Sequence, residues 1–385
     1  MEEADRSAPR GLSDTLLAWR NRLAASPRFQ RWASRFPLTR MLARRDALRL
    51  YDIVAGFVYA QVMRAAVELE LLERLQNGPR SVESLALCCG LPVARMETLC
   101  QSAAALGLLT RRPDGHYALG RLGAAALGVP GLAAMVRHHD AFYADLADPV
   151  ALMRGEADPA LARTWPYVTD AKGGQGIDAK TAATYSELMR LSQAMVAEET
   201  LGAVSLRDTR HLMDVGGGTG AFLTAAARRW PTLQATLFDL PAVVAGAGPR
   251  LQAAGLAERI RVLGGSFRDS PLPEGADAIS LVRVLYDHDE ATVAALLSAA
   301  RAALPANGLL IVAEPMSGGD RPSRIGDAYF GFYTMAMTTG RPRAPAHHAD
   351  LLAAAGFVDI RVRRTVRPFI AGVVTARSPD TKRGF

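Results

Sequence analysis

A glycine-rich turn after an apolar segment is the part of this chain whose residue types point most directly to chemistry. Residues 212–220 read Leu-Met-Asp-Val-Gly-Gly-Gly-Thr-Gly. Glycines permit positive φ angles and let a ligand approach the backbone closely, while the free N–H groups of a helix that begins near Thr219 favour an anionic group. The turn therefore predicts a binding site for a nucleotide-like cofactor.

Two classes of cofactor fit this turn. Gly216, Gly218 and Ala221 match the G-x-G-x-x-G/A fingerprint of dinucleotide-binding folds, and Asp239 ends the next apolar segment, where an acid binds ribose hydroxyls. An acid at the end of the first strand together with a fourth glycine instead resembles the first motif of S-adenosylmethionine-dependent methyltransferases. We favour S-adenosyl-L-methionine over a nicotinamide cofactor. The cofactor-binding residues expected from these two segments are Asp214, Gly216, Gly218, Gly220 and Asp239.

Alternating strands and helices must position the turn. From Thr209 onward, apolar segments of strand length alternate with helical stretches, which predicts an α/β fold: a Rossmann-like sheet with helices on both faces and a ligand over the carboxyl ends of the strands. The last two segments leave no room for a helix, so we expect a hairpin whose final strand is antiparallel to its neighbours. The expected strands are residues 211–215, 234–239, 259–263, 278–285, 309–314, 358–364 and 370–375, in a domain of residues 206–378.

The preceding residues divide into a small domain and a connector. Residues 51–128 have a winged-helix-like pattern, with helices expected over 53–75, from Ser81 and up to Ala105, and then a hairpin around residues 113–115. The candidate recognition helix, residues 93–106, contains Arg95 as its one basic residue, which favours dimerisation over DNA binding. Residues 129–205 are expected to form a helical connector that contributes to an acceptor pocket.

Residues 1–50 form a basic arm. They hold eleven arginines and five acids, a charge of +6 out of the net +7 of the chain. Leu16 and Trp19 fall at helical spacing, as do Phe29, Trp32 and Phe36, which predicts amphipathic helices. Three roles remain open: peripheral binding to an anionic membrane, packing on the protein's own body, and binding of nucleic acid, which we expect least.

Composition limits the remaining functions. The 385 residues are 49% hydrophobic and 22% charged, enough for two cores. We find no uninterrupted apolar run of the length that spans a bilayer, and the acidic start of the chain is unlike a signal peptide, so we expect a cytoplasmic protein. Cys88, Cys89 and Cys100 lack metal-ligand or redox spacing, and we expect no metal site.

Several motifs occur in the order found in the winged-helix O-methyltransferases, which the chain resembles over about residues 52–375. Ser266 and Phe267 follow the third strand where the family places residues that flank adenine, with serine in place of the usual acid. Residues 283–290, Arg-Val-Leu-Tyr-Asp-His-Asp-Glu, resemble the family's R-V-L-H-D-W-D-D block. The resemblance implies S-adenosylmethionine as cofactor, a homodimer, and cofactor contacts from Ser266, Phe267 and Arg283.

The chain departs from the family at its catalytic residues. Tyr286 stands where the family has a catalytic histidine, and His288 stands where tryptophan is usual. Glu314 keeps an acid that supports the histidine in plant members, whereas the acid of the family's G-x-E-R motif is Pro342 here. We therefore expect the catalytic candidates to be His288, Tyr286 and Glu314, with positioning of the reactants as the larger contribution.

The whole pattern, arm included, is most similar to family members that methylate the hydroxyl of a carotenoid, such as demethylspheroidene or hydroxyneurosporene, in purple photosynthetic bacteria. Alternatives are a bacteriochlorophyllide C-methyltransferase, an O-methyltransferase of small aromatic or polyketide acceptors, and a ligand-sensing DNA-binding regulator. An apolar acceptor would need an apolar pocket, although methionine and aromatic residues at helical spacing also suit a plain core. The pocket candidates are Met189, Met195, Tyr329, Phe330, Tyr333 and Met337.

Overall fold

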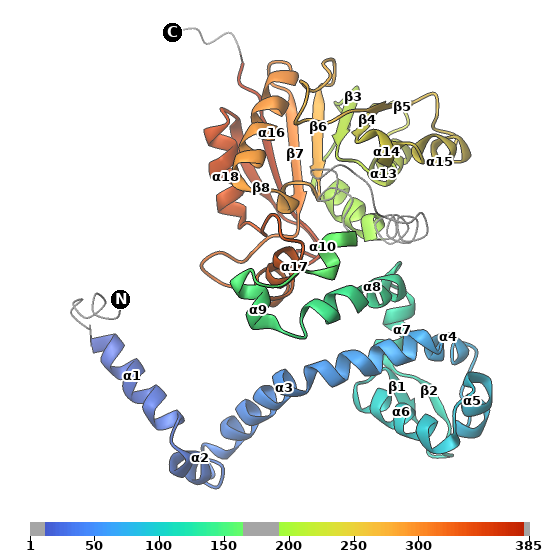
Figure 1. Cartoon of the computed structure of the whole chain (residues 1–385), viewed down its shortest axis with the longest axis vertical. Helices are drawn as coiled ribbons and strands as arrows, with labels where there is room; N and C mark the ends of the chain where they lie inside the picture. The colour runs from blue at the N-terminus through green and yellow to red at the C-terminus, as the bar shows by residue number, and fades with distance from the viewer. Residues whose placement is uncertain (1–11, 165–191, 381–385) are drawn as a thin grey trace. The chain divides into compact units, whose positions relative to one another are not determined.

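The computed structural model describes residues 12–164 and 192–380. The chain separates into two compact units, residues 1–124 and 125–385. Figure 1 shows the helical first unit and the second unit built around a sheet.

The first unit begins with three helices: α1 (Leu12–Ala24), α2 (Pro27–Ala33) and α3 (Arg40–Glu68). The side chain of Ser26 accepts a hydrogen bond from the Phe29 backbone N–H, and Pro27 occupies the first turn of α2, so both residues favour the start of a new helix here. The Trp32 ring stacks on Phe36 with centroids 4.8 Å apart. Trp19 and Trp32 are nevertheless 62% and 51% exposed.

Helix α3 differs from the helix expected over residues 53–75. It begins thirteen residues earlier, at Arg40, and ends at Glu68, because Glu70 takes a left-handed conformation with φ 51° before the short α4 (Leu71–Arg74). Among the described helices, α3 has the length and apolar composition to cross a membrane, and only 11% of its apolar window is buried. One such helix is weak evidence for a membrane span.

The rest of the first unit has the expected arrangement of short helices and a hairpin. Ser81 caps α5 by accepting from the Ser84 N–H, and Gly90 ends that helix with φ 65°. Leu109 pairs with Leu119 across an antiparallel hairpin, so the predicted turn at residues 113–115 is present. The elements are α5 (Val82–Cys89), α6 (Val93–Ala105), β1 (Leu109–Arg111), β2 (Tyr117–Leu119) and α7 (Arg121–Leu127), which reaches into the second unit.

The second unit is built on a seven-stranded sheet with strand order β5-β4-β3-β6-β7-β9-β8. The first five strands in this order are parallel, and β9 is antiparallel to both β7 and β8. The predicted α/β fold and its terminal hairpin are therefore confirmed. The strands are β3 (His211–Val215), β4 (Gln234–Asp239), β5 (Ile260–Gly264), β6 (Ala278–Val282), β7 (Leu309–Glu314), β8 (Val358–Arg363) and β9 (Gly372–Arg377).

Helices cover both faces of the sheet, each over its own apolar core (Figure 1). One core contains Phe222 of α13 and Val196 from the helix of residues 192–203. The other contains Leu296 of α16 and Leu352 of α18. These helices and their short neighbours are α13 (Ala221–Arg229), α14 (Pro241–Val244), α15 (Ala247–Ala253), α16 (Glu290–Ala303) and α18 (Pro345–Ala354).

A third cluster joins the connector to a helical insertion after β7. Phe142 and Leu161 pack with Tyr333 and Met337 in one buried core. The elements are α8 (Leu132–Asp145), α9 (Pro149–Arg154), α10 (Ala160–Thr164), the π-helix η3 (Arg324–Tyr329) and α17 (Phe330–Ala336).

Strand β6 is shorter than the segment predicted over residues 278–285. It ends at Val282, because Arg283 adopts φ 58°, a left-handed conformation that breaks the strand. A 3-10 turn, η2 (Leu285–Asp287), follows and leads into α16. Residues 283–288 thus form a turn at the carboxyl end of a central strand, the position where open α/β sheets bind ligands.

Candidate active site

A cavity of about 270 Å³ opens at the carboxyl ends of the parallel strands. Its walls come from the loops after β3, β4, β5 and β6, so segments far apart in sequence meet here. The described lining residues are Gly216, Phe238, Asp239, Leu240, Gly265, Ser266, Phe267, Arg268, Asp269, Arg283, Val284, Asp287 and His288.

The glycine turn supplies one wall. Gly216 has φ 72°, and a Cβ at this position would lie 2.6 Å from Cγ2 of Val284, so both conformation and space require glycine. The Asp239 carboxylate accepts hydrogen bonds from the N–H groups of Gly218 and Leu240, each at 2.7 Å. Asp239 therefore faces the cavity and also fixes the shape of the turn. Gly218 and Gly220 have positive φ angles but are not among the described lining residues.

Asp214 lies beneath the turn and does not line the described cavity wall. Its side chain is fully buried, accepts a 2.6 Å hydrogen bond from the Ser280 hydroxyl, and lies where a Cβ on Gly217 would meet it. Burial raises the pKa of Asp214 to about 7 despite the hydrogen bond from Ser280, and the nearby charge of Asp239 adds to the rise. The position suits a residue that supports the turn from below.

The loop after β5 forms the opposite wall together with His288. The His288 ring meets Phe267 edge-on with centroids 5.5 Å apart, and its Nδ1 lies 3.3 Å from Arg268 Nη2. Burial and the adjacent charge of Arg268 lower the pKa of His288 to about 4. Ser266 and Phe267, two of the expected cofactor-binding residues, line the cavity, and so does Arg268, which the sequence analysis does not single out.

The turn after β6 brings the remaining candidates together. Tyr286 is 1% exposed, and its hydroxyl accepts a long hydrogen bond of 3.4 Å from Arg283, which also donates to Ser192 at 2.7 Å. Burial, followed by the charge of Asp287, raises the pKa of Tyr286 well above its usual 10. Glu314 accepts hydrogen bonds from the N–H groups of Val284 and Leu285 at 3.0 and 2.8 Å, so it contacts the turn's backbone.

Asp287 is a site residue that the sequence analysis did not single out. It is buried and lines the cavity, and its Oδ1 has no hydrogen-bond partner among the described residues. Burial and the neighbouring carboxylate of Glu314 raise the pKa of Asp287 well above its usual value. An unpartnered buried carboxylate oxygen at the wall provides an acceptor for an N–H or O–H group of a ligand. The sequence feature that could have identified Asp287 is its position within the block of residues 283–290.

Three of the acceptor-pocket candidates, Tyr329, Phe330 and Tyr333, form an aromatic cluster next to Tyr286. The Tyr286 ring lies 6.2 Å from that of Phe330, and Tyr329 stacks on Tyr333 at 5.9 Å. Met337 is fully buried in the core cluster, Met195 is half-buried on the helix of residues 192–203, and Met189 lies outside the described residues.

Two histidines of α8 extend this aromatic cluster. His138 and His139 each form a 2.8 Å hydrogen bond, to the hydroxyls of Tyr333 and Tyr329 respectively. Burial lowers the pKa of both rings, that of His138 to about 4, so they remain neutral near pH 7. Sequence reasoning missed them because the partners are 195 and 190 positions apart.

Among the described residues, no cluster of three or more histidine, cysteine or acidic side chains has the arrangement of a metal site. The cavity wall instead combines a glycine turn, the acid Asp239 at the end of the second strand and aromatic side chains. With the strand order of the sheet, this combination defines the class of nucleotide-cofactor-dependent Rossmann-like enzymes.

The chain belongs to the O-methyltransferase family. Residues 143–358 match the family model for an O-methyltransferase domain, and residues 51–128 match that for an O-methyltransferase dimerisation domain. The enzyme is therefore a methyltransferase that depends on S-adenosylmethionine, and its dimerisation domain supports a homodimer.

Similar proteins and solved structures also support membership of the O-methyltransferase family. The chain is 55% identical over 359 residues to demethylspheroidene O-methyltransferase of Cereibacter sphaeroides, covering 93% of this chain and 94% of that one. It is 47% identical to the protein of the same name from Rhodobacter capsulatus, covering 92% and 88%. A methyltransferase of calicheamicin biosynthesis bound to S-adenosylhomocysteine has a TM-score of 0.73 at 29% identity, over 87% of this chain and 98% of that one.

Proposed function

We propose that the protein transfers the methyl group of S-adenosylmethionine to the hydroxyl of a carotenoid, a 1-hydroxycarotenoid such as demethylspheroidene or hydroxyneurosporene. The observation behind this proposal is the 55% identity with a demethylspheroidene O-methyltransferase along nearly the whole chain. The aromatic cluster beside Tyr286 agrees with it, because a long polyene needs apolar walls.

The cavity residues fit the cofactor. In this proposal Asp239 would bind the ribose hydroxyls, Phe267 and Ser266 would contact the adenine, and the unpartnered oxygen of Asp287 would accept from a donor group of the cofactor or acceptor; all four line the cavity. Arg283 offers a cation for the carboxylate of the amino-acid part. Bound there, S-adenosylmethionine supplies an electrophilic methyl group on a sulfonium.

The chain's own contribution to the reaction is mainly positioning. Holding the acceptor hydroxyl in line with the methyl group contributes roughly 7 to 11 kcal/mol, more than a general base, which contributes about 10²- to 10⁴-fold in rate. The hydroxyl of a 1-hydroxycarotenoid is tertiary and is too weak an acid to ionise before the methyl transfer. Its proton therefore leaves as the new C–O bond forms. His288 and Asp287 on the wall are the candidate proton acceptors.

Tyr286 and Glu314 have different roles in this proposal. Tyr286 lies between Arg283 and the aromatic cluster and orients the acceptor. Glu314 does not line the described cavity, and its contacts with backbone N–H groups make it a positioning residue for the turn. The acceptor pocket would contain Tyr329, Phe330, Tyr333, Met195, Met189 and Met337.

An acceptor panel tests the substrate. Purified protein with S-adenosylmethionine is given a detergent-dispersed 1-hydroxycarotenoid, a bacteriochlorophyllide and a small phenol, and S-adenosylhomocysteine release is measured. We expect kcat/KM for the carotenoid to exceed the other two by at least about 10²-fold. Preferred turnover of the phenol or the bacteriochlorophyllide would assign the protein to one of the alternative activities instead.

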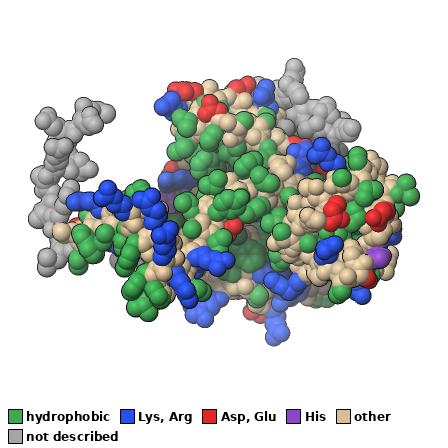
Figure 2. Space-filling model, turned by 90° about the horizontal axis from the view of Figure 1, so that it is seen from below, with side chains coloured by type: hydrophobic (Ala, Val, Ile, Leu, Met, Phe, Trp, Pro, Cys, Tyr) green, Lys and Arg blue, Asp and Glu red, His purple; other side chains and the backbone are tan. Residues whose placement is uncertain are grey.

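We also propose that residues 1–50 hold the enzyme on an anionic membrane, the phase in which an apolar acceptor dissolves. Support comes from the charge of +6 and from the exposed Trp19 and Trp32. Figure 2 shows basic side chains gathered along the N-terminal helices beside hydrophobic ones. The enzyme would then be cytoplasmic and peripheral on the inner or photosynthetic membrane.

The exposed apolar surface of α3 has a second explanation in the dimer. Ile53 and Phe57, 74% and 70% exposed, lie within the dimerisation domain that begins at residue 51. We propose that a second copy covers this part of α3, which would leave the residues before 51 for the membrane.

A further inference from the structure

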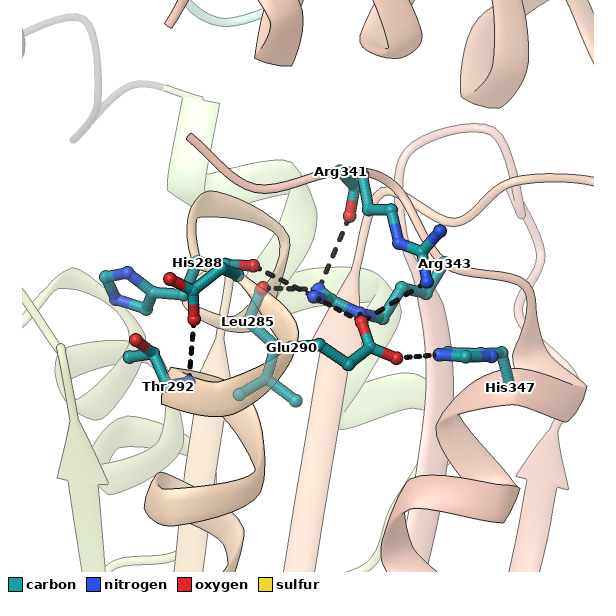
Figure 3. Close-up of polar contacts among 8 residues, drawn as sticks. Leu285, His288, Glu290, Thr292, Arg341, Arg343 and His347 are labelled. Carbon is teal, nitrogen blue, oxygen red and sulfur yellow. Dashed lines mark hydrogen bonds and ion pairs between the residues drawn. The ribbon is translucent and has the colours of Figure 1, made fainter. Parts of the chain in front are cut away.

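Arg343 is a buried cation that reaches the backbone of the cavity turn. Its side chain is 1% exposed. Nη1 donates to the Leu285 carbonyl at 2.7 Å, and Nη2 donates to the His288 carbonyl at 2.9 Å. These two carbonyls lie on either side of Tyr286 and Asp287, so one guanidinium links both ends of residues 285–288; Figure 3 shows the two contacts. The planar fork of arginine allows this, and the single ammonium of lysine does not.

Glu290 fixes the guanidinium in place. Its Oε2 lies 3.1 Å from Arg343 Nη2 and 3.2 Å from Nε, and its Oε1 accepts from His347 of α18 (Figure 3). Burial raises the pKa of Glu290, but hydrogen bonds from His347 and Arg343 outweigh it and lower the pKa to about 2. The carboxylate is therefore ionised at any working pH, and Arg343 is held from α16 and α18 together.

The turn is thus held from two sides. Glu314 accepts hydrogen bonds from two backbone N–H groups of the turn, and Arg343 donates to two of its backbone carbonyls. These buried backbone groups therefore find their partners inside the protein. The loop that delivers Arg343 packs directly on the turn, because a Cβ at Gly340 would lie 2.0 Å from the Tyr286 carbonyl oxygen. Gly340 also has φ 73°, so both its backbone conformation and the lack of space for a Cβ require glycine here.

We propose that Arg343, anchored by Glu290, is a positioning residue that sets the geometry of Asp287 and His288 at the cofactor cavity. It acts through the backbone of the turn and touches no reactant. The proposal rests on the proposed function, because it assumes that the cavity is where S-adenosylmethionine binds. Its consequence is specific: loss of the clamp weakens cofactor binding and changes the rate at saturation less.

The test compares Arg343→Lys with Arg341→Lys in the full-length protein. Arg341 contacts the same Glu290 at 3.3 Å but is exposed and makes no described contact with the turn, so it controls for charge near Glu290. For Arg343→Lys we expect S-adenosylmethionine to bind about tenfold or more weakly by calorimetry, with a smaller fall in kcat at saturating cofactor, because Asp287 and His288 shift together with the turn. For Arg341→Lys we expect affinity within twofold of the parent.

Chemical rescue separates positioning from general loosening of the fold. Arg343→Ala leaves a guanidinium-sized space, and millimolar guanidinium should restore at least part of the cofactor affinity, whereas ammonium at equal ionic strength should not. If Arg343→Lys or Arg343→Ala does not fold, Glu290→Gln serves instead, with an expected affinity loss of about three- to fivefold.

Three outcomes would overturn the inference: parental affinity in Arg343→Lys, equal losses in Arg343→Lys and Arg341→Lys, or parental affinity in Glu290→Gln. Failure of the parent itself to bind S-adenosylmethionine would count against the proposed function, which keeps the two conclusions separable.

Discussion

At the scale of single residues, Asp239 gives the most direct test of the cofactor site. Its carboxylate faces the cavity and also accepts from Gly218 and Leu240 N–H groups. Asp239→Ala should weaken S-adenosylmethionine binding by about 1.5 to 3 kcal/mol for each charge-assisted hydrogen bond lost. Calorimetry on Asp239→Ala and Asp239→Asn checks this, with the asparagine variant expected between parent and alanine. Parental affinity in both variants would contradict the assignment.

The pKa of His288 makes a second prediction. An ordinary histidine base would make kcat fall as the pH drops through about 6.5. Since burial and Arg268 lower the pKa of His288 to about 4, the ring stays neutral down to that pH. We therefore expect that protonation of His288 does not lower kcat between pH 7 and 5. The parent and His288→Gln should show the same dependence of kcat on pH over this range. A decline with a midpoint of 6 to 7 that disappears in His288→Gln would show that the ring is far less buried during turnover.

The sequence predicts those site residues that lie at the ends of strands or in the glycine turn. Gly216, Asp239 and Phe267 all line the cavity, and each lies at the end of its own strand or within three residues after it. Arg343 and His138 could not be found this way. Their partners, Leu285 and Tyr333, lie 58 and 195 positions away, and only the folded chain brings them together.

At the scale of elements, periodicity located the strands and backbone conformation set their ends. β3, β4 and β7 have the predicted bounds, since buried parallel strands are continuous apolar runs. β6 stops at Val282, three residues short of the predicted end, because Arg283 leaves the extended region. The apolar residues after it form the cavity turn, which no hydrophobic pattern distinguishes from strand.

The N-terminal arm is the element whose role is open to direct experiment. Replacing Arg28, Arg31 and Arg35 with glutamine should reduce binding to anionic liposomes, because each arginine near such a surface contributes roughly 1 kcal/mol. Flotation with anionic and with neutral vesicles measures this, and removal of residues 1–45 should abolish binding. Turnover of detergent-dispersed acceptor should survive. Equal flotation of parent and truncated protein would show that the arm has another function.

At the scale of the whole molecule, buried neutral histidines couple the fold to pH. Burial and Arg343 lower the pKa of His348 to about 3, whereas the unfolded chain titrates near 6.5. The unfolded state therefore takes up this proton first, and stability is lost as the pH falls below about 6.5. Relative to His348→Leu, the parent should lose about 2 kcal/mol of unfolding free energy between pH 7.5 and 5. Urea titrations of both proteins measure the difference, and parallel pH dependence would refute it.

Methylation of a carotenoid oxygen with S-adenosylmethionine is the reaction that an experiment should test first. The most direct measurement incubates the purified protein with a 1-hydroxycarotenoid and S-adenosylmethionine labelled with deuterium in its methyl group, and then locates the label by mass spectrometry. We expect the intact labelled methyl group on the former hydroxyl oxygen, with one S-adenosylhomocysteine formed for each product. Label on carbon, or no labelled carotenoid while the protein binds the cofactor, would show that the protein is not a carotenoid O-methyltransferase.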